Sequence, residues 1–152
     1  MSTEKKKQSH DVIHILEGYF AKAPVLPINI KEMLVKYVPY FALVFGIIGI
    51  IFSISSLGIL GITSPLAIVG GAETVNSYGT SFVSSLFSIV SSAMMVMAYQ
   101  SLQAKKLNGW NLMFWSEVVN IIGSIILLNI IGAVISGLIG FYLLYQIKSF
   151  YK

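Results

Sequence analysis

The sequence predicts an all-α polytopic membrane protein, with four transmembrane helices in a bundle preceded by one or two short amphipathic interfacial helices. Composition is the first observation: 56% of the 152 residues are hydrophobic and 11% are charged, against about a quarter charged in soluble domains. The second is the grouping of apolar residues into runs long enough to cross a bilayer. The third is the distribution of the lysines, which avoid two of the stretches between these runs.

The residue inventory argues against most site chemistry. Cys is absent, which removes disulfides, thiol catalysis and cysteine-based metal sites. Arg is also absent, so no side chain can bind phosphate in a bidentate manner. His10 and His14 have a helical spacing that can hold a metal, but without a third ligand an exposed polar face is the better interpretation. The net charge of +4 lacks the aromatic surface of nucleic-acid binding. We therefore expect no enzymatic activity, no cofactor, no metal and no nucleic-acid partner.

Residues 1–37 are predicted to form a cytoplasmic tail with amphipathic helices. Apolar residues recur at three- and four-residue spacing through Ser9–Phe20, and Pro24 follows that helix. Asn29 is a suitable N-cap for a second helix, and the lysines of that helix, such as Lys31, suit the membrane interface. The alternative is that the two helices are soluble and pack on each other.

Residues 38–152 make up the predicted transmembrane domain. Its apolar runs have about 17 to 23 residues, and a helix of this length covers the hydrocarbon core of about 30 Å. The four spans are residues 40–60, 80–102, 110–128 and 131–147. Pro39 is expected in the first turn of the first span, and Ser64-Pro65 at the start of a short interfacial turn.

The lysines predict the orientation. Six lysines precede the first span, two lie in the loop after the second (Lys105 and Lys106), and two follow the fourth. The long loop Gly61–Gly79 and the tight turn Asn129-Ile130 contain none. Because lysine-rich segments stay on the cytoplasmic side, we expect a multi-pass protein of the cell membrane with both termini cytoplasmic and Gly61–Gly79 outside.

Small residues recur at helical spacing in three of the spans, where they let another helix approach closely. The predicted helix-packing residues are Gly46, Gly49, Ser84, Ser88, Ser92, Gly132, Ser136 and Gly140. The serines of the second span allow two interpretations. They could line a polar pore, or they could form a packing face whose hydroxyls bond to backbone carbonyls. We favour the packing face.

Glu117 is the one ionisable residue inside a predicted span, and such residues are candidates for function. Asn120 and Ser124 continue its helix face. If the last two spans pair symmetrically about Ile130, Glu117 meets Leu143 and the neighbouring polar side chains. The candidate intramembrane polar site is then Glu117, Asn120, Ser124, Tyr142 and Gln146, with the last two as donors to the carboxylate. We favour a structural carboxyl near the interface over a proton- or ion-handling one.

Several stretches resemble a family of small uncharacterised bacterial four-helix integral membrane proteins. They are Ser64-Pro65-Leu66-Ala67 in the first loop, Gly109-Trp110-Asn111 after the central lysines, and Gly140-Phe141-Tyr142-Leu143-Leu144-Tyr145-Gln146 near the end. The resemblance covers the chain from about Pro39 onward. It implies four membrane helices and no particular activity.

The expected function is that of a non-enzymatic structural or assembly component of the cell membrane. Its expected partners are the lipid bilayer and either a second copy of the chain or another membrane protein, because the glycine and serine faces favour helix association. The alternative is a small transporter or channel subunit that uses Glu117 and the serine-rich second span.

Overall fold

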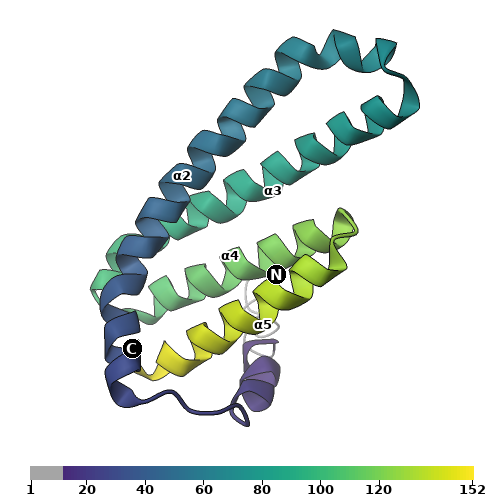
Figure 1. Cartoon of the computed structure of the whole chain (residues 1–152). Coiled ribbons are helices and arrows are strands. Elements are labelled where there is room, and N and C mark those ends of the chain that lie inside the picture. The colour runs from purple at the N-terminus through teal and green to yellow at the C-terminus, as the bar shows by residue number, and fades with distance from the viewer. Residues whose placement is uncertain (1–11) are drawn as a thin grey trace, which may run out of the picture.

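The computed structural model describes residues 12–152, and every regular element in this range is a helix. The long helices form two successive antiparallel hairpins (Figure 1). The elements are α2 (Ile28–Val69), α3 (Gly71–Gln103), α4 (Leu107–Ile126), α5 (Ile130–Ile147) and the 3-10 turn η1 (Lys148–Phe150). A further helix covers residues 12–20. The predicted all-α class is confirmed.

Three helical segments are long and apolar enough to cross a membrane: α2, α3 and Ile130–Phe150, which is α5 extended through η1. The helix α4, which contains most of the predicted third span, has 20 residues but is not apolar enough. Polar side chains lower its mean hydropathy, at Asn108, Asn111, Glu117 and Asn120. The multi-helix membrane character therefore rests on three apolar helices, and the fourth span stays a prediction.

The helix α2 is continuous over 42 residues, about 63 Å at 1.5 Å per residue. It joins the predicted second amphipathic helix, first span and interfacial turn, so the separate amphipathic helix beginning at Asn29 is not seen. The predicted domain boundary at residue 38 also falls inside this helix. Pro39 and Pro65 both lie within it. A proline frees the carbonyl four residues earlier, and for Pro65 this is the carbonyl of Gly61, which accepts a hydrogen bond from Ser64 Oγ at 3.0 Å.

The predicted external loop Gly61–Gly79 is wrong as a loop, because helix continues through it on both sides of one sharp reversal. The reversal falls at Gly70-Gly71, where Gly71 has a φ of 79° that favours glycine. Thr74 Oγ1 donates to the Gly70 carbonyl at 3.0 Å and helps to close the turn. As a result, the α2–α3 hairpin extends well past the ends of α4 and α5 (Figure 1).

The opposite end of the molecule gathers the start of α2, the α3–α4 turn and the end of α5 (Figure 1). Lys105 in that turn has a left-handed φ of 51°. Lys152 stabilises the turn, because its N–H donates to the Lys105 carbonyl at 3.0 Å and its carbonyl accepts from Leu107 N at 2.8 Å. Six of the seven lysines of the described range belong to these segments, at positions 31, 36, 105, 106, 148 and 152, and Lys22 lies between helix 12–20 and α2.

The core lies near this lysine-rich end. Trp110 and Phe114, in the first turns of α4, are fully buried, and their rings stack with centroids 5.5 Å apart. Trp110 Nε1 donates to the Leu144 carbonyl of α5 at 2.7 Å. Helix 12–20 packs on the same cluster, where Phe20 stacks on Tyr145 of α5 at 5.5 Å. The short N-terminal helix therefore packs against α5, which neither sequence interpretation expected.

Candidate functional site

Glu117 lies on α4 at its contact with α5. A Cβ atom added to Gly140 would lie 2.8 Å from Glu117 Cδ, so Glu117 faces Gly140 and not Leu143 as predicted. The register differs by three residues because α4 ends at Ile126, and the chain reverses over residues 127–129. The predicted reversal at Asn129-Ile130 lay too far along the chain.

The Glu117 side chain lines a cavity of about 230 Å³ between the four long helices. Its other polar lining residues are Ser116 and Asn120. Apolar side chains from every long helix complete the wall, among them Leu34, Val38, Met95, Met113, Leu143 and Ile147. The cavity is therefore a mostly apolar chamber with one carboxyl group in its wall.

The Glu117 carboxyl is only partly satisfied. Its Oε1 atom is buried and has no hydrogen-bond partner among the described residues, while the Ser136 side chain of α5 interacts with the carboxyl. An unsatisfied buried polar atom costs about 1–3 kcal/mol. Such an atom can accept a hydrogen bond from a ligand that enters the chamber.

Two predicted neighbours of Glu117 on α4 have different roles. Asn120 lines the chamber, and its Oδ1 accepts from Ser91 Oγ of α3 at 3.0 Å. This bond ties α3 to α4 beside Glu117. Ser124 does not line the chamber; its carbonyl accepts from Asn129 N at 2.8 Å and so belongs to the hairpin turn.

The prediction that Tyr142 and Gln146 donate to Glu117 is wrong. Tyr142 Oη donates to the Pro24 carbonyl at 2.7 Å, and Gln146 Nε2 donates to the same oxygen at 3.0 Å. Tyr142 is two residues past Gly140, about 200° around the helix, so it points away from α4. Gln146 follows one turn later on the same face as Tyr142.

These two residues belong to a contact that sequence reasoning missed. The N-terminal strap, residues 12–26, lies along the outer face of α5. Tyr145 Oη donates to the Ile13 carbonyl at 2.7 Å, and Lys148 Nζ pairs with Glu17 at 2.6 Å. A signal was present, because α5 ends in a run of polar and aromatic residues that a membrane helix facing lipid does not need. His10 of the predicted histidine pair lies outside the described residues, and His14 is 3.4 Å from Glu17.

Two predicted packing glycines of α2, Gly46 and Gly49, lie against α3, a partner that the sequence did not specify. A Cβ on Gly46 would lie 2.7 Å from Val96 Cγ2 and 2.9 Å from the Ser92 carbonyl oxygen, and one on Gly49 would collide with Ser92 Oγ. Two other predicted packing residues sit elsewhere, because Ser84 is exposed and Gly132 is closest to the capping side chain of Asn129.

The buried serines of α3 are Ser85, Ser91 and Ser92, and Ser88 is only half-buried. Ser85 Oγ bonds to Ser56 Oγ of α2 at 3.2 Å and to the Ser81 carbonyl at 2.9 Å. Ser91 Oγ bonds to the Ser88 carbonyl at 3.3 Å as well as to Asn120. These hydroxyls connect to their own helix backbone and to neighbouring helices, as the packing-face interpretation expects.

No family model matches the chain, and no curated protein or solved structure is similar to it. The resemblance to small bacterial four-helix membrane proteins therefore stays a prediction. The function has to be argued from the chamber, the helix faces and the distribution of charge.

Proposed function

We propose that the protein is a non-enzymatic, multi-pass component of the cell membrane that assembles, through its α2–α3 hairpin, with a second copy or another membrane protein. The observation that carries this proposal is the outer part of the hairpin, past the ends of α4 and α5. No other described element covers it (Figure 1). Small residues there have no neighbour, because nothing lies within 4 Å of a Cβ added to Gly61 of α2 or Gly79 of α3, and Ser84 of α3 is exposed. Large apolar side chains beside them, such as Ile62, suit lipid. Uncovered small residues let a helical partner approach closely within the bilayer.

The absence of cysteine makes cross-linking a direct test. Single cysteines at Ile62 in α2 and at Ile131 in α5 form a matched pair, because these isoleucines are 82% and 76% exposed. In native membranes we expect a bifunctional maleimide to give a defined adduct from Ile62→Cys only. Adducts of equal yield at both positions, or at neither, would contradict assembly through the hairpin.

The proposed orientation places the lysine-rich end in the cytoplasm. It is supported by six of the seven described lysines, which lie in the start of α2, the α3–α4 turn and the segment after α5, as the positive-inside tendency requires. A cysteine at Ser77 near the hairpin tip should react with an impermeant reagent in intact cells, and a cysteine at Lys152 should not. Labelling at Lys152 would reverse the orientation.

A second candidate function is favoured by one observation, the unsatisfied Glu117 Oε1 in the chamber wall. Under this alternative the chain is a small transporter subunit in which the charge of Glu117 binds a cation or relays a proton. Glu117→Gln separates the two functions. As a structural group Glu117 can be replaced with a loss of about 1 kcal/mol or less. A flux through wild-type proteoliposomes that disappears in Glu117→Gln, with folding retained, would establish the transport function.

A further inference from the structure

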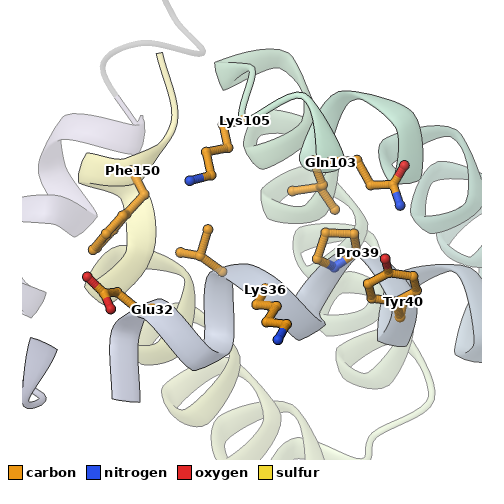
Figure 2. A pocket seen from close by; sticks show the side chains of 9 residues that line it. Glu32, Lys36, Pro39, Tyr40, Gln103, Lys105 and Phe150 are labelled. Atoms are coloured by element: carbon orange, nitrogen blue, oxygen red, sulfur yellow. The ribbon is translucent and has the colours of Figure 1, made fainter. Parts of the chain in front are cut away.

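A second cavity is larger than the Glu117 chamber. A pocket of about 600 Å³ opens at the lysine-rich end between α2, the α3–α4 turn and the C-terminal residues (Figure 2). Its volume is in the range of small-molecule sites, about 300–1,000 Å³. Buried residues line it deeply, namely Val35, Pro39 and Leu102. Exposed polar residues form its rim, namely Glu32, Lys36, Tyr40, Gln103 and Lys105.

The rim carries charges of both signs. Figure 2 shows Lys105 reaching over the opening from the α3–α4 turn, with Glu32 and Lys36 on α2 across from it. Within residues 12–152 none of these three side chains forms an ion pair. The Lys36 ammonium lies over the ring of Tyr37 at 5.6 Å, so Lys105 and Glu32 are the opposite charges with most freedom to meet a ligand.

Lys105 is also held in place by its backbone. Its N–H donates to the Leu102 carbonyl at 3.0 Å, and its carbonyl accepts from Lys152 N at 3.0 Å. These two bonds hold the left-handed φ of 51°, which a residue other than glycine rarely adopts. The neighbouring Lys106 has the same charge but does not line the pocket.

The pocket adjoins the apolar surface of α2. Beyond Tyr40, which lines the rim, residues at three- and four-residue spacing continue the same side of the helix. They are Val44, Ile47 and Ile51, which are 51%, 44% and 58% exposed. A ligand with its polar end at the rim and acyl chains along these residues would match both surfaces, whereas a soluble phosphoester would use the rim alone.

We propose that this pocket binds one phospholipid through a zwitterionic phosphoethanolamine headgroup, a lipid of the cytoplasmic leaflet if the orientation proposed above holds. Lys105 pairs with the phosphate and Glu32 with the ammonium, while Tyr40 and Gln103 offer further hydrogen bonds. A headgroup with phosphate alone would leave the Glu32 carboxylate unmatched beside a second negative charge. The proposal is independent of assembly through the hairpin tip, since the two surfaces lie at opposite ends of the molecule.

The test is lipid retention by the purified full-length protein in mild detergent, measured by native mass spectrometry. The probes are dioleoyl phosphatidylethanolamine, dioleoyl phosphatidylglycerol and soluble glycerophosphoethanolamine. We expect the wild type to bind phosphatidylethanolamine in preference to both others. Lys105→Gln should weaken this binding about tenfold, the usual effect of losing one charge-assisted hydrogen bond. Glu32→Gln should remove the preference over phosphatidylglycerol.

The matched control is Lys106→Gln, which makes the same charge change one residue away from the pocket. It should bind phosphatidylethanolamine as the wild type does. Lys105→Arg, which keeps the positive charge, should also bind this lipid better than Lys105→Gln does. Equal losses in Lys105→Gln and Lys106→Gln would overturn the site in favour of general surface charge. If the wild type retained phosphatidylglycerol as well as phosphatidylethanolamine, the claim of a zwitterionic headgroup would be wrong. If the soluble headgroup bound as tightly as the lipid, the claim that the ligand is a membrane lipid would be wrong.

Discussion

The two hairpins hold their helices together in different ways. In α2–α3 the backbones approach closely, with Gly46 and Gly49 against Ser92. In α4–α5 a large indole, Trp110, fills the interface and bonds to the opposite backbone at Leu144. Aromatic contacts across the first hairpin lie away from these glycines, where Tyr40 meets Tyr99 at 6.2 Å and Tyr78 Oη donates to the Thr63 carbonyl at 3.2 Å. The lysine-rich end of the second hairpin is built around stacked rings.

This difference follows the surroundings of each contact. Inside hydrocarbon, burying an apolar side chain gains little over leaving it in lipid, so close backbone approach and hydrogen bonds stabilise helix pairs. The aromatic cluster lies at the lysine-rich end, where the strap and the α3–α4 turn also meet. Near water, burial of rings such as Trp110 and Phe114 again contributes. The three variants below test this division, in order of decreasing effect.

Trp110→Ala should destabilise the fold most. It removes a fully buried ring, its stacking on Phe114, and the hydrogen bond to the Leu144 carbonyl. Large aromatic deletions in cores cost about 3–5 kcal/mol. Unfolding by denaturing detergent, followed by circular dichroism, measures the loss. Trp110→Phe keeps one aromatic ring but loses the N–H and part of the buried volume, so it should lose less than Trp110→Ala. A loss below about 1 kcal/mol would mean that the aromatic cluster does not hold the second hairpin.

Gly46→Ala should have an intermediate effect. The added Cβ would lie 2.9 Å from the Ser92 carbonyl oxygen, which cannot move without shifting α3, and overpacking of this kind costs about 1–3 kcal/mol. Gly58→Ala is the control, because nothing lies within 4 Å of its Cβ position on the same helix. It should be neutral or stabilise by up to about 1 kcal/mol through helix propensity. Equal behaviour of the two variants would refute close approach as the basis of α2–α3 packing.

Tyr151→Phe should have the smallest effect at neutral pH, a change of about 1 kcal/mol or less. Its hydroxyl is buried without a hydrogen-bond partner in the described chain, so little is lost with it. Burial raises the pKa of Tyr151 to about 12. The folded state then holds this proton more tightly than the unfolded state, and stability falls as the pH rises from about 10 to about 12. The difference between the thermal midpoints at about pH 8 and about pH 11 should be smaller in Tyr151→Phe than in the wild type. Identical pH dependence in both proteins would contradict this.

Composition and periodicity predicted the helical class, the turn at the central lysines and the close contact at Gly46 and Gly49. These depend on local sequence, so they can be inferred without knowing neighbours. The helix boundaries near glycine and proline could not be predicted in this way. Ser64 donates to the Gly61 carbonyl that Pro65 leaves without a helical partner, so the helix continues through the proline. One boundary also changed the predicted pairing of α4 with α5. Because α4 ends at Ile126, two residues before the predicted end, Glu117 faces Gly140 and not Leu143.

The partners of Tyr142 and Gln146 were out of reach for another reason. Both bind the Pro24 carbonyl, across separations of 118 and 122 residues. A backbone carbonyl leaves no trace in residue type, so no pattern in the sequence marks it as an acceptor. What the sequence did show was a polar face on α5 in need of a partner.

The N-terminal strap can bind α5 only after the ribosome has made α5. At about 5–20 residues per second, the 120 residues between Leu26 and its partner Gln146 take about 6–24 s to synthesise. Through that interval α2 and α3 can already pair, while Ile13, Pro24 and Leu26 still lack the side chains that bind them. The strap is thus made early but reaches its final place only after α5 has been made.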